Sequence, residues 1–318
     1  MQTEVNPNTI VYFNNRYVPL ADAQVGILTH AFNYGTGVFD GIRGYWDDKQ
    51  RELFLVRPED HFARWKANCG MLRIDVPLAA AQLSEVTAEL IRRNQFQTNV
   101  YVRPLGYKSA QRIGVIPDDR DAFAVALVPF GDYLDSHAGL HAGVVSWRRV
   151  EDTAIPGRAK ICGAYVNSAL ASDEARRNGF DEAIFLNQSG HVAEGATCNI
   201  FLVKGERLIT PPGTENILEG ITRASVIELA SRELHLEIVE RPVDRSELYF
   251  ADEVFFTGTA VEIAPVVQVD HRPVKSGAIG PVARQLRRLY YEATRGYLAH
   301  YRHWLMRVYH PEILGKAA

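Results

Sequence analysis

The sequence predicts an α+β protein made of two domains. Short apolar runs typical of strands are mixed with separate amphipathic stretches typical of helices, and the two kinds do not alternate strictly. With 318 residues, the chain exceeds the usual size of a single domain. We expect a small α/β domain over residues 1–130, a linker over 131–140 and a large cofactor-binding domain over 141–318, because residues 131–140 form a polar, glycine-containing stretch.

A predicted hairpin opens the first domain over residues 9–20, with Asn14 and Asn15 at a turn that tolerates positive φ. Apolar residues recur at helical spacing after Pro58 and predict a helix there. The other predicted elements are a strand over 52–56, a helix over 79–93, and strands over 99–105 and 122–129. The run over 122–129 is continuously apolar, which is typical of a strand buried on both faces.

The second domain is predicted to start with a strand over 141–147, followed by a helix over 166–178. Two hairpins follow, with turns at 188–190 and around Gly205. Apolar stripes predict further helices over 222–234 and 280–295.

Composition excludes several classes of protein. Apolar residues make up 47% of the chain and charged residues 23%, which argues against disorder. The formal charge of −3 gives no reason to propose a nucleic-acid surface. Three widely separated cysteines indicate neither a disulfide framework nor a thiolate metal site. No apolar stretch is long enough for a membrane span or a leader, so we expect a soluble cytoplasmic protein.

Lys160 is the residue whose surroundings best fit a reactive amine. It follows Arg158 by two residues and lies between Gly157 and Gly163, in a segment of small and apolar residues. Desolvation or a neighbouring cation lowers the pKa of a lysine and frees its lone pair for nucleophilic attack. A surface lysine is the more common environment, so the residue types alone leave both interpretations open.

Two segments are suited to bind a phosphate group. Residues 219–222 precede an amphipathic helix, so the backbone N–H groups of Ile221 and Thr222 are placed to meet an anion. A simple N-cap formed by Thr222 is the alternative. Residues 258–260 follow a predicted strand in a tight turn that offers further N–H groups.

Glu194 lies in an apolar, strand-like run, where an unpaired carboxylate is costly. A protonated ring nitrogen and an ordinary arginine ion pair would each supply the cationic partner that it needs. The histidines are scattered, without an HExxH motif or a paired i, i+4 ligand set, so no metal site is expected. Motifs of the GxGxxG, GxxxxGK[ST] and GxSxG types are absent, which removes the usual support for nucleotide-binding and serine-hydrolase functions.

Seven segments carry further motifs in a consistent order along nearly the whole chain. They are HAFNYGTGVFDGIR (30–43), DHFAR (60–64), YVRPL (101–105), RAKICGAYVNSALA (158–171), GHVAEGATCNIF (190–201), ILEGITRASVIELA (217–230) and ADEVFFTGTAVEIAPV (251–266). Together they resemble the fold-type IV pyridoxal-phosphate (PLP) enzymes, and within them the branched-chain amino-acid aminotransferases. The resemblance implies a D-amino-acid aminotransferase-like fold, pyridoxal 5'-phosphate as cofactor, and ping-pong transamination between branched-chain L-amino acids and 2-oxoglutarate or glutamate.

The resemblance also implies a role for each cofactor-binding residue. Lys160 would form the Schiff base and move the substrate proton, and Tyr165 would hydrogen-bond the phenolic oxygen. Glu194 would keep the pyridine nitrogen protonated, so that the ring accepts electrons. The phosphate would be bound by Arg64, Ile221, Thr222 and Thr259.

For the substrate, the resemblance implies an apolar and aromatic pocket lined by Tyr34, Phe39, Tyr101, Phe130 and Tyr133. Arg103 corresponds to the arginine that receives the distal carboxylate of glutamate, and Arg43 lies near the same pocket. Backbone N–H groups of Thr259 and Ala260 would bind the α-carboxylate.

The same resemblance implies a homodimer or a higher homo-oligomer. A loop over about residues 108–118 of a partner would cover the site, with Val115 pointing inward. Lys108, Gln111 and Arg112 stand where common bacterial relatives are more glycine-rich and apolar. We therefore expect this loop to alter the substrate pocket and not the reaction class.

Two alternatives stay open. A D-amino-acid or (R)-amine transaminase, or an aminodeoxychorismate lyase, would share the scaffold, although the YVRPL and GTA motifs favour the L-branched-chain arrangement. A non-catalytic binding protein of the same fold would have no need to keep both Lys160 and Glu194.

Overall fold

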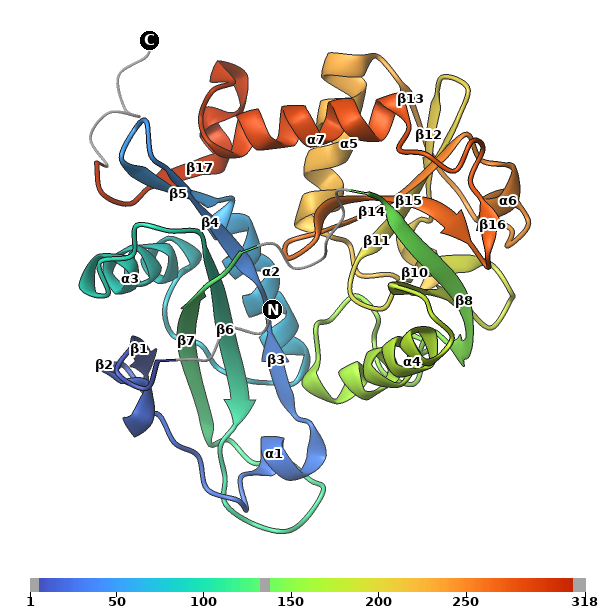
Figure 1. The fold of residues 1–318 in the computed structure, drawn as a ribbon. Coiled ribbons are helices and arrows are strands. Elements are labelled where there is room, and N and C mark those ends of the chain that lie inside the picture. Colours follow the sequence, from blue (N-terminus) through green and yellow to red (C-terminus); the bar gives the residue numbers. More distant parts are fainter. Residues whose placement is uncertain (1–5, 132–137, 311–318) are drawn as a thin grey trace. The chain divides into compact units, whose positions relative to one another are not determined.

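The computed structural model describes residues 6–131 and 138–310, which form an α+β protein as the sequence predicts (Figure 1). The chain divides into two compact units. In the described part, the first unit comprises residues 6–131, 160–163 and 292–310, and the second comprises 138–159 and 164–291.

The first unit is built on an eight-stranded sheet in the order β17-β5-β4-β6-β7-β1-β2, with β3 also paired to β6. Every pairing in it is antiparallel. The strands are β1 (Ile10–Phe13), β2 (Arg16–Pro19), β3 (Gly37–Phe39), β4 (Ile42–Asp47), β5 (Glu52–Val56), β6 (Val100–Lys108), β7 (Asp121–Pro129) and β17 (Leu305–Arg307). The predicted hairpin of β1 and β2 is confirmed, with Asn14 and Asn15 at φ of 49° and 61°.

Helices α2 (Pro58–Met71) and α3 (Ala80–Arg93) pack against each other and against this sheet, and the short α1 (His30–Tyr34) precedes β3. Both longer helices lie where the sequence predicts them. α2 buries Phe62, Trp65 and Cys69, the apolar residues that recur at helical spacing. Gly106 of β6 allows this close packing, because a Cβ atom there would lie 2.8 Å from the Cys69 sulfur.

The second unit is built on a nine-stranded sheet in the order β10-β9-β8-β15-β14-β11-β12-β13, with β16 paired to β15. The sheet is mixed, since β8 pairs in parallel with β9 and β15, and β12 pairs in parallel with β13. The strands are β8 (Leu140–Arg148), β9 (Glu182–Leu186), β10 (Val192–Gly195), β11 (Asn199–Lys204), β12 (Arg207–Thr210), β13 (Glu237–Glu240), β14 (Glu253–Gly258), β15 (Glu262–Val269) and β16 (Arg272–Pro273).

The helices of this region are α4 (Tyr165–Arg177), α5 (Ile221–Leu234), α6 (Glu247–Phe250) and α7 (Pro281–Thr294). α4 packs on β8 and β9, and α5 packs on β13 and β14. The stripe that predicted α5 is buried at Val226, Leu229 and Ala230. Both predicted hairpins are confirmed, with Gly190 and Gly205 at φ of 86° and 60° in their turns.

Several sequence expectations differ from the structure. Strand β7 alternates between buried and half-buried residues, so the prediction that it is buried on both faces is wrong. The pattern of apolar residues did not reveal α1, β3 or β4. Residues 160–163 and 292–310 group with the first unit, whereas the sequence placed them in the second domain. The reason is pairing at long range. β17 extends the first sheet beside β5, and Ile161 forms a bridge with Val38 of β3.

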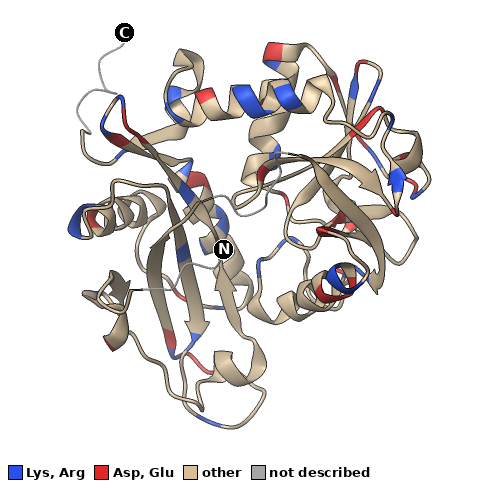
Figure 2. Cartoon of the chain, viewed as in Figure 1, with Lys and Arg blue, Asp and Glu red and all other residues tan. Residues whose placement is uncertain are grey.

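Acidic and basic residues are interspersed over the elements of both units (Figure 2), so the net charge of −3 is not concentrated in one element. Within the described ranges, none of the helices combines the length and apolarity that crossing a membrane requires. The described residues also contain no group of three or more His, Cys, Asp or Glu side chains arranged to hold a metal ion.

Glu52, at the start of β5, fastens the C-terminal segment to the first sheet. Its side chain is 0% exposed. Burial alone raises the pKa of Glu52, but the hydrogen bonds that its carboxylate accepts outweigh burial and lower it. The donors are the backbone N–H groups of Leu53, Val308, Tyr309 and His310, at 2.8–3.1 Å, and Arg307 Nε, at 2.9 Å.

We expect Glu52→Ala to lower the free energy of unfolding by about 3–5 kcal/mol, because it leaves Arg307 and several buried N–H groups without their acceptor. Urea denaturation measures this loss. The matched control is the exposed Glu85 on α3, for which Glu85→Ala should change stability by less than about 0.5 kcal/mol. A loss in Glu52→Ala no larger than that of the control would show that strand pairing alone holds the C-terminal segment.

Candidate active site

Lys160 lies beside β3 in the first unit. Its carbonyl oxygen accepts a hydrogen bond from the Phe39 N–H at 3.1 Å, and Val38 and Ile161 form an antiparallel bridge. Lys160 is half-buried between two buried neighbours, and its Nζ is 5.2 Å from the centre of the Phe39 ring. The backbone of this segment is therefore fixed, and its amine is set against an aromatic face.

The Phe39 ring also contacts Arg103, whose guanidinium carbon is 4.3 Å from the ring centre. Arg103 Nη2 donates to the Tyr101 hydroxyl at 3.3 Å, and the Tyr101 ring is 5.0 Å from the Phe130 ring. A Cβ atom at Gly41 would lie 1.9 Å from the Tyr101 hydroxyl, so only glycine leaves room for the tyrosine. The structure thus brings Arg103 together with three of the five aromatic residues predicted for the substrate. Tyr34 contacts His30 and the Gly114 N–H instead.

Arg43 occupies the buried side of this group. It donates two hydrogen bonds to the Gly131 carbonyl, at 3.3 and 3.4 Å, and stacks on the Phe130 ring at 4.7 Å. Arg103 is exposed, whereas Arg43 is buried. Arg103 is therefore the arginine better placed to meet a carboxylate from solvent. Tyr133 lies outside the described residues.

Arg64 is held by Asp40, a residue for which the sequence analysis predicts no role. Arg64 Nε and Nη2 donate to the two Asp40 oxygens at 2.9 and 2.7 Å, and His61 Nδ1 lies 3.0 Å from Oδ1. Burial alone raises the pKa of Asp40, but the charge of Arg64 and the bond from His61 hold it well below its usual range. Burial lowers the pKa of His61, so a neutral imidazole with a proton on Nδ1 supports the ion pair. Asp40 thereby fixes the direction of the guanidinium.

Glu194 lies in the second unit and is 5% exposed. Arg149 Nε is 2.9 Å from Oε1, so the arginine ion pair anticipated as one alternative is present. Oε2 accepts hydrogen bonds from Asn199 Nδ2 at 3.1 Å and from the Leu218 N–H at 3.2 Å. This arrangement orients the carboxylate, whose two oxygens together can accept about four hydrogen bonds.

Asn199 connects this carboxylate to the start of α5. Its Nδ2 also donates to the Leu218 carbonyl at 2.7 Å, and a Cβ atom at Gly220 would lie 2.2 Å from its Oδ1. Gly220 is the N-cap of the 14-residue α5 and provides no side-chain cap. The alternative in which Thr222 caps the helix is therefore wrong, since Thr222 is buried within the first turn. The backbone N–H groups of the first turn, which include Ile221 and Thr222, suit an anion.

The Gly258-Thr259-Ala260 turn joins β14 to β15 and lies close to residues that follow Glu194. A Cβ atom at Gly258 would be 3.4 Å from Cys198 Cβ, and Asn199 pairs with Thr257 across the sheet. Cys198 and Asn199 thus connect Glu194, the start of α5 and this turn. Tyr165 is half-buried as the first residue of α4.

Glu182, at the start of β9, supports the segment that follows Glu194. Its Oε1 accepts from the N–H groups of Ala183 at 2.9 Å and Ala196 at 3.2 Å. The residue is 7% exposed, and burial raises the pKa of its carboxyl group to about 7, with the two hydrogen bonds opposing the rise.

Comparison with known proteins shows the family of the chain. A family model described as amino-transferase class IV matches residues 37–269. A probable branched-chain-amino-acid aminotransferase of Aquifex aeolicus is 45% identical over 299 residues, which cover 94% of this chain and 96% of the relative.

Solved structures show the same similarity. The branched-chain aminotransferase of the thermophilic archaeon Thermoproteus uzoniensis, solved with norvaline, has a TM-score of 0.89 at 40% identity, covering 95% of this chain and 99% of its own. The PLP form of the branched-chain amino acid aminotransferase from Thermobaculum terrenum has a TM-score of 0.91 at 39% identity, with the same coverages of 95% and 99%.

The fold and the family model place the chain among class IV amino-transferases of fold type IV. Within that class, the chain belongs to the branched-chain-amino-acid aminotransferase family.

A pH-dependent stability follows from Glu182. Because the folded-state pKa is about 7 and the ordinary value is 4.5, the folded protein keeps a proton that the unfolded chain releases. The stabilisation is complete at acidic pH and is lost as the pH rises through about 7. We subtract the unfolding free energy of wild type from that of Glu182→Gln at each pH. We expect this difference to increase by about 3 kcal/mol from pH 4.5 to pH 8.

Urea denaturation of the two proteins across this range measures the gain, since other ionisable groups cancel in the difference. Glu237→Gln, at an exposed position on β13, is the control and should show no such slope. A constant difference between Glu182→Gln and wild type at every pH would contradict the raised pKa.

Proposed function

We propose that this chain catalyses PLP-dependent transamination between branched-chain L-amino acids and 2-oxoglutarate or glutamate. The observation that carries the proposal is the frame formed by Glu194, Asn199 and Gly220. One asparagine links a buried carboxylate to a helix N-terminus that has no side-chain cap. A pyridine ring with a protonated nitrogen at one end and a phosphate at the other needs these two partners at a fixed separation.

The residues present fit this cofactor. Lys160 would hold it covalently, Tyr165 would donate to its phenolic oxygen, and Glu194 would pair with its ring nitrogen. When bound, PLP supplies an electron sink for the carbanion at the substrate α-carbon. The phosphate partners would be Arg64, Ile221, Thr222 and Thr259, among which Arg64 is preoriented by Asp40.

The proton chemistry would belong to Lys160. Its Nζ would be the base that takes the proton from the α-carbon of the amino donor and, as an ammonium, passes it on in the same half-reaction. In the second half-reaction it would return a proton to the α-carbon of the product amino acid. The Phe39 ring, whose centre is 5.2 Å from Nζ, gives this atom an aromatic neighbour. Backbone N–H groups of Thr259 and Ala260 would meanwhile bind the α-carboxylate and orient the C–H bond.

Both substrate classes would use one group of side chains. Phe39, Tyr101 and Phe130 form an aromatic surface for a leucine-like chain, to which we add Tyr34 and Tyr133. Arg103 would receive the distal carboxylate of glutamate, and Arg43 would hold Phe130 in place from the buried side. Arg112 is engaged within its own loop, where Nη2 donates to the Ile116 carbonyl.

We further propose a homodimer or higher homo-oligomer in the cytoplasm. Ile113, Val115 and Ile116 expose large apolar side chains on one loop, which suits burial by a second copy of the chain. In such an assembly Val115 would enter the site of the partner. The cysteines at 69, 162 and 198 all lie in the described ranges and form no disulfide there, in keeping with a reducing compartment.

We expect Lys160→Ala to abolish multiple turnover while PLP still binds noncovalently, because the phosphate contacts do not need the amine. Mixing the PLP-loaded wild-type protein with L-leucine should change the cofactor absorbance, and the variant should not respond. The control is Lys49→Ala, at an exposed position. If Lys160→Ala turns over near the wild-type rate, the assignment of Lys160 as the catalytic lysine is wrong.

If the wild-type protein responds only to D-amino acids or (R)-amines, the protein belongs to one of those transaminase classes and not to the L-branched-chain class.

Arg103 is expected to separate the two substrate classes. Charge-assisted hydrogen bonds contribute about 1.5–3 kcal/mol, so Arg103→Met should reduce kcat/KM for 2-oxoglutarate by roughly ten- to a hundredfold. The efficiency with the keto acid of leucine should change much less. The comparison variant is Arg112→Ala, which should affect both substrates similarly. If Arg112→Ala selectively loses activity with glutamate, the distal carboxylate is bound by the loop and not by Arg103.

A further inference from the structure

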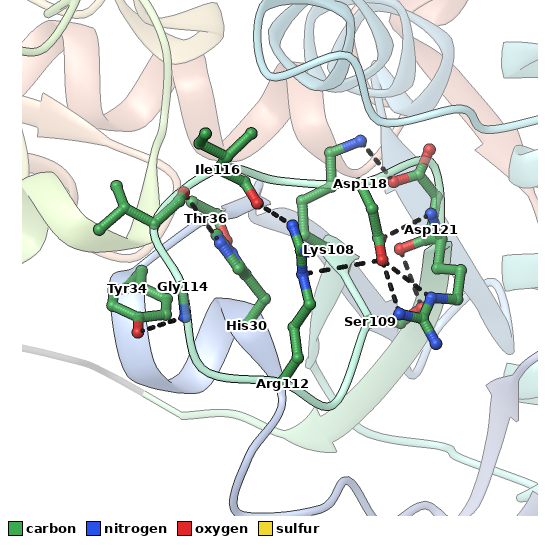
Figure 3. A network of polar contacts seen from close by, with 12 residues as sticks. His30, Tyr34, Thr36, Lys108, Ser109, Arg112, Gly114, Ile116, Asp118 and Asp121 are labelled. Carbon is green, nitrogen blue, oxygen red and sulfur yellow. Dashed lines mark hydrogen bonds and ion pairs between the residues drawn. The ribbon is translucent and has the colours of Figure 1, made fainter.

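The loop over residues 109–120, between β6 and β7, exposes apolar side chains on a fixed backbone. Ile113, Val115 and Ile116 are 82%, 74% and 79% exposed. Loops usually carry polar residues and owe their mobility to a scarcity of contacts. Here polar contacts hold the loop from its inner side (Figure 3).

His30 provides the central contact. The side chain is buried, with the residue 0% exposed, and Nε2 lies 3.1 Å from the Val115 carbonyl oxygen. A carbonyl oxygen only accepts hydrogen bonds, so Nε2 must carry the proton. Nδ1 lies 2.7 Å from Thr36 Oγ1, and in the neutral ring it accepts the proton of that hydroxyl. The Val115 carbonyl thereby selects the tautomer, and the Thr36 hydroxyl satisfies the remaining ring nitrogen.

Neighbouring residues complete the support on either side of Val115. The Tyr34 ring packs 4.7 Å from the His30 ring, and the Tyr34 hydroxyl accepts the Gly114 N–H at 3.0 Å. On the other side Arg112 donates to the Ile116 carbonyl. Three consecutive residues of the loop therefore each have a backbone polar group bound to a side chain.

The base of the loop is tied to the same segment by backbone hydrogen bonds. The His30 N–H donates to the Ala110 carbonyl at 2.8 Å, and the Arg112 N–H donates to the Leu28 carbonyl at 3.1 Å. The loop therefore loses its conformational entropy when the chain folds, and binding to another molecule does not require that loss again.

We propose that His30 is a positioning residue that fixes Val115 and thereby sets the substrate side-chain preference of the enzyme. The inference rests on the proposed function, in which Val115 enters the site of a partner. His30 does not touch the reacting atoms. It acts through the Val115 backbone, so its loss would loosen the wall against which a branched side chain packs.

The test compares two substitutions that differ in reach. The amide nitrogen of glutamine can take the place of Nε2, whereas the shorter asparagine side chain cannot reach the Val115 carbonyl. We expect His30→Asn to increase amide hydrogen exchange in residues 112–117 about tenfold and to raise KM for the keto acid of leucine about fivefold. In this variant, kcat should stay within about twofold and the cofactor spectrum should not change. His30→Gln should restore most of both losses.

A third variant serves as a control for misfolding. Thr36→Val keeps the shape but removes the hydroxyl that donates to Nδ1, so its loop exchange should lie between those of wild type and His30→Asn. Equal exchange in wild type and His30→Asn, or equal defects in His30→Asn and His30→Gln, would overturn the proposal. A fall in kcat together with loss of cofactor from His30→Asn would also overturn it, as a general structural role. If wild type shows no transamination, the proposed function itself fails, whatever the exchange data show.

Discussion

The contact between Asn199 and the segment that begins α5 is the constraint on which the second unit's part of the site depends. One amide group donates to the Glu194 carboxylate and to the Leu218 carbonyl, and its oxygen occupies the space that a side chain at residue 220 would need. The carboxylate is consequently fixed relative to the helix N-terminus by covalent geometry and two hydrogen bonds. Arg149 adds a charge on the opposite oxygen and prevents the carboxylate from rotating.

In the first unit, arginine side chains are oriented by aromatic rings and by a buried carboxylate. Asp40 accepts two bonds from Arg64, and its negative charge is tolerated at full burial because the ion pair and His61 satisfy both oxygens. Arg103 instead lies on the exposed side of the Phe39 ring. Arg64 is thus held in one direction by its ion pair, whereas Arg103 stays accessible to solvent.

The sequence predicted those parts of the fold that depend on local periodicity. Residues 58–71 and 221–234 carry helical spacing, and glycine and asparagine mark the hairpin turns, so these elements were found. α1 and β3 have five and three residues, too few for a period to be visible. The resemblance identified the expected cofactor residues, whereas Arg149 and Asp40 were not found, because their partners are chosen by tertiary packing across 45 and 24 positions of the chain.

The hydrogen bonds that Glu52 accepts from residues 307–310 also determine when the first unit can be completed during synthesis. The carboxylate emerges early, but its partner at His310 follows 258 residues later. At 5–20 residues per second, the ribosome needs about 10–50 s to produce that interval. Until residues 305–310 have been made, β5 lacks its β17 neighbour and Glu52 lacks the donors of residues 307–310, so β5 remains an open edge strand able to pair with another chain.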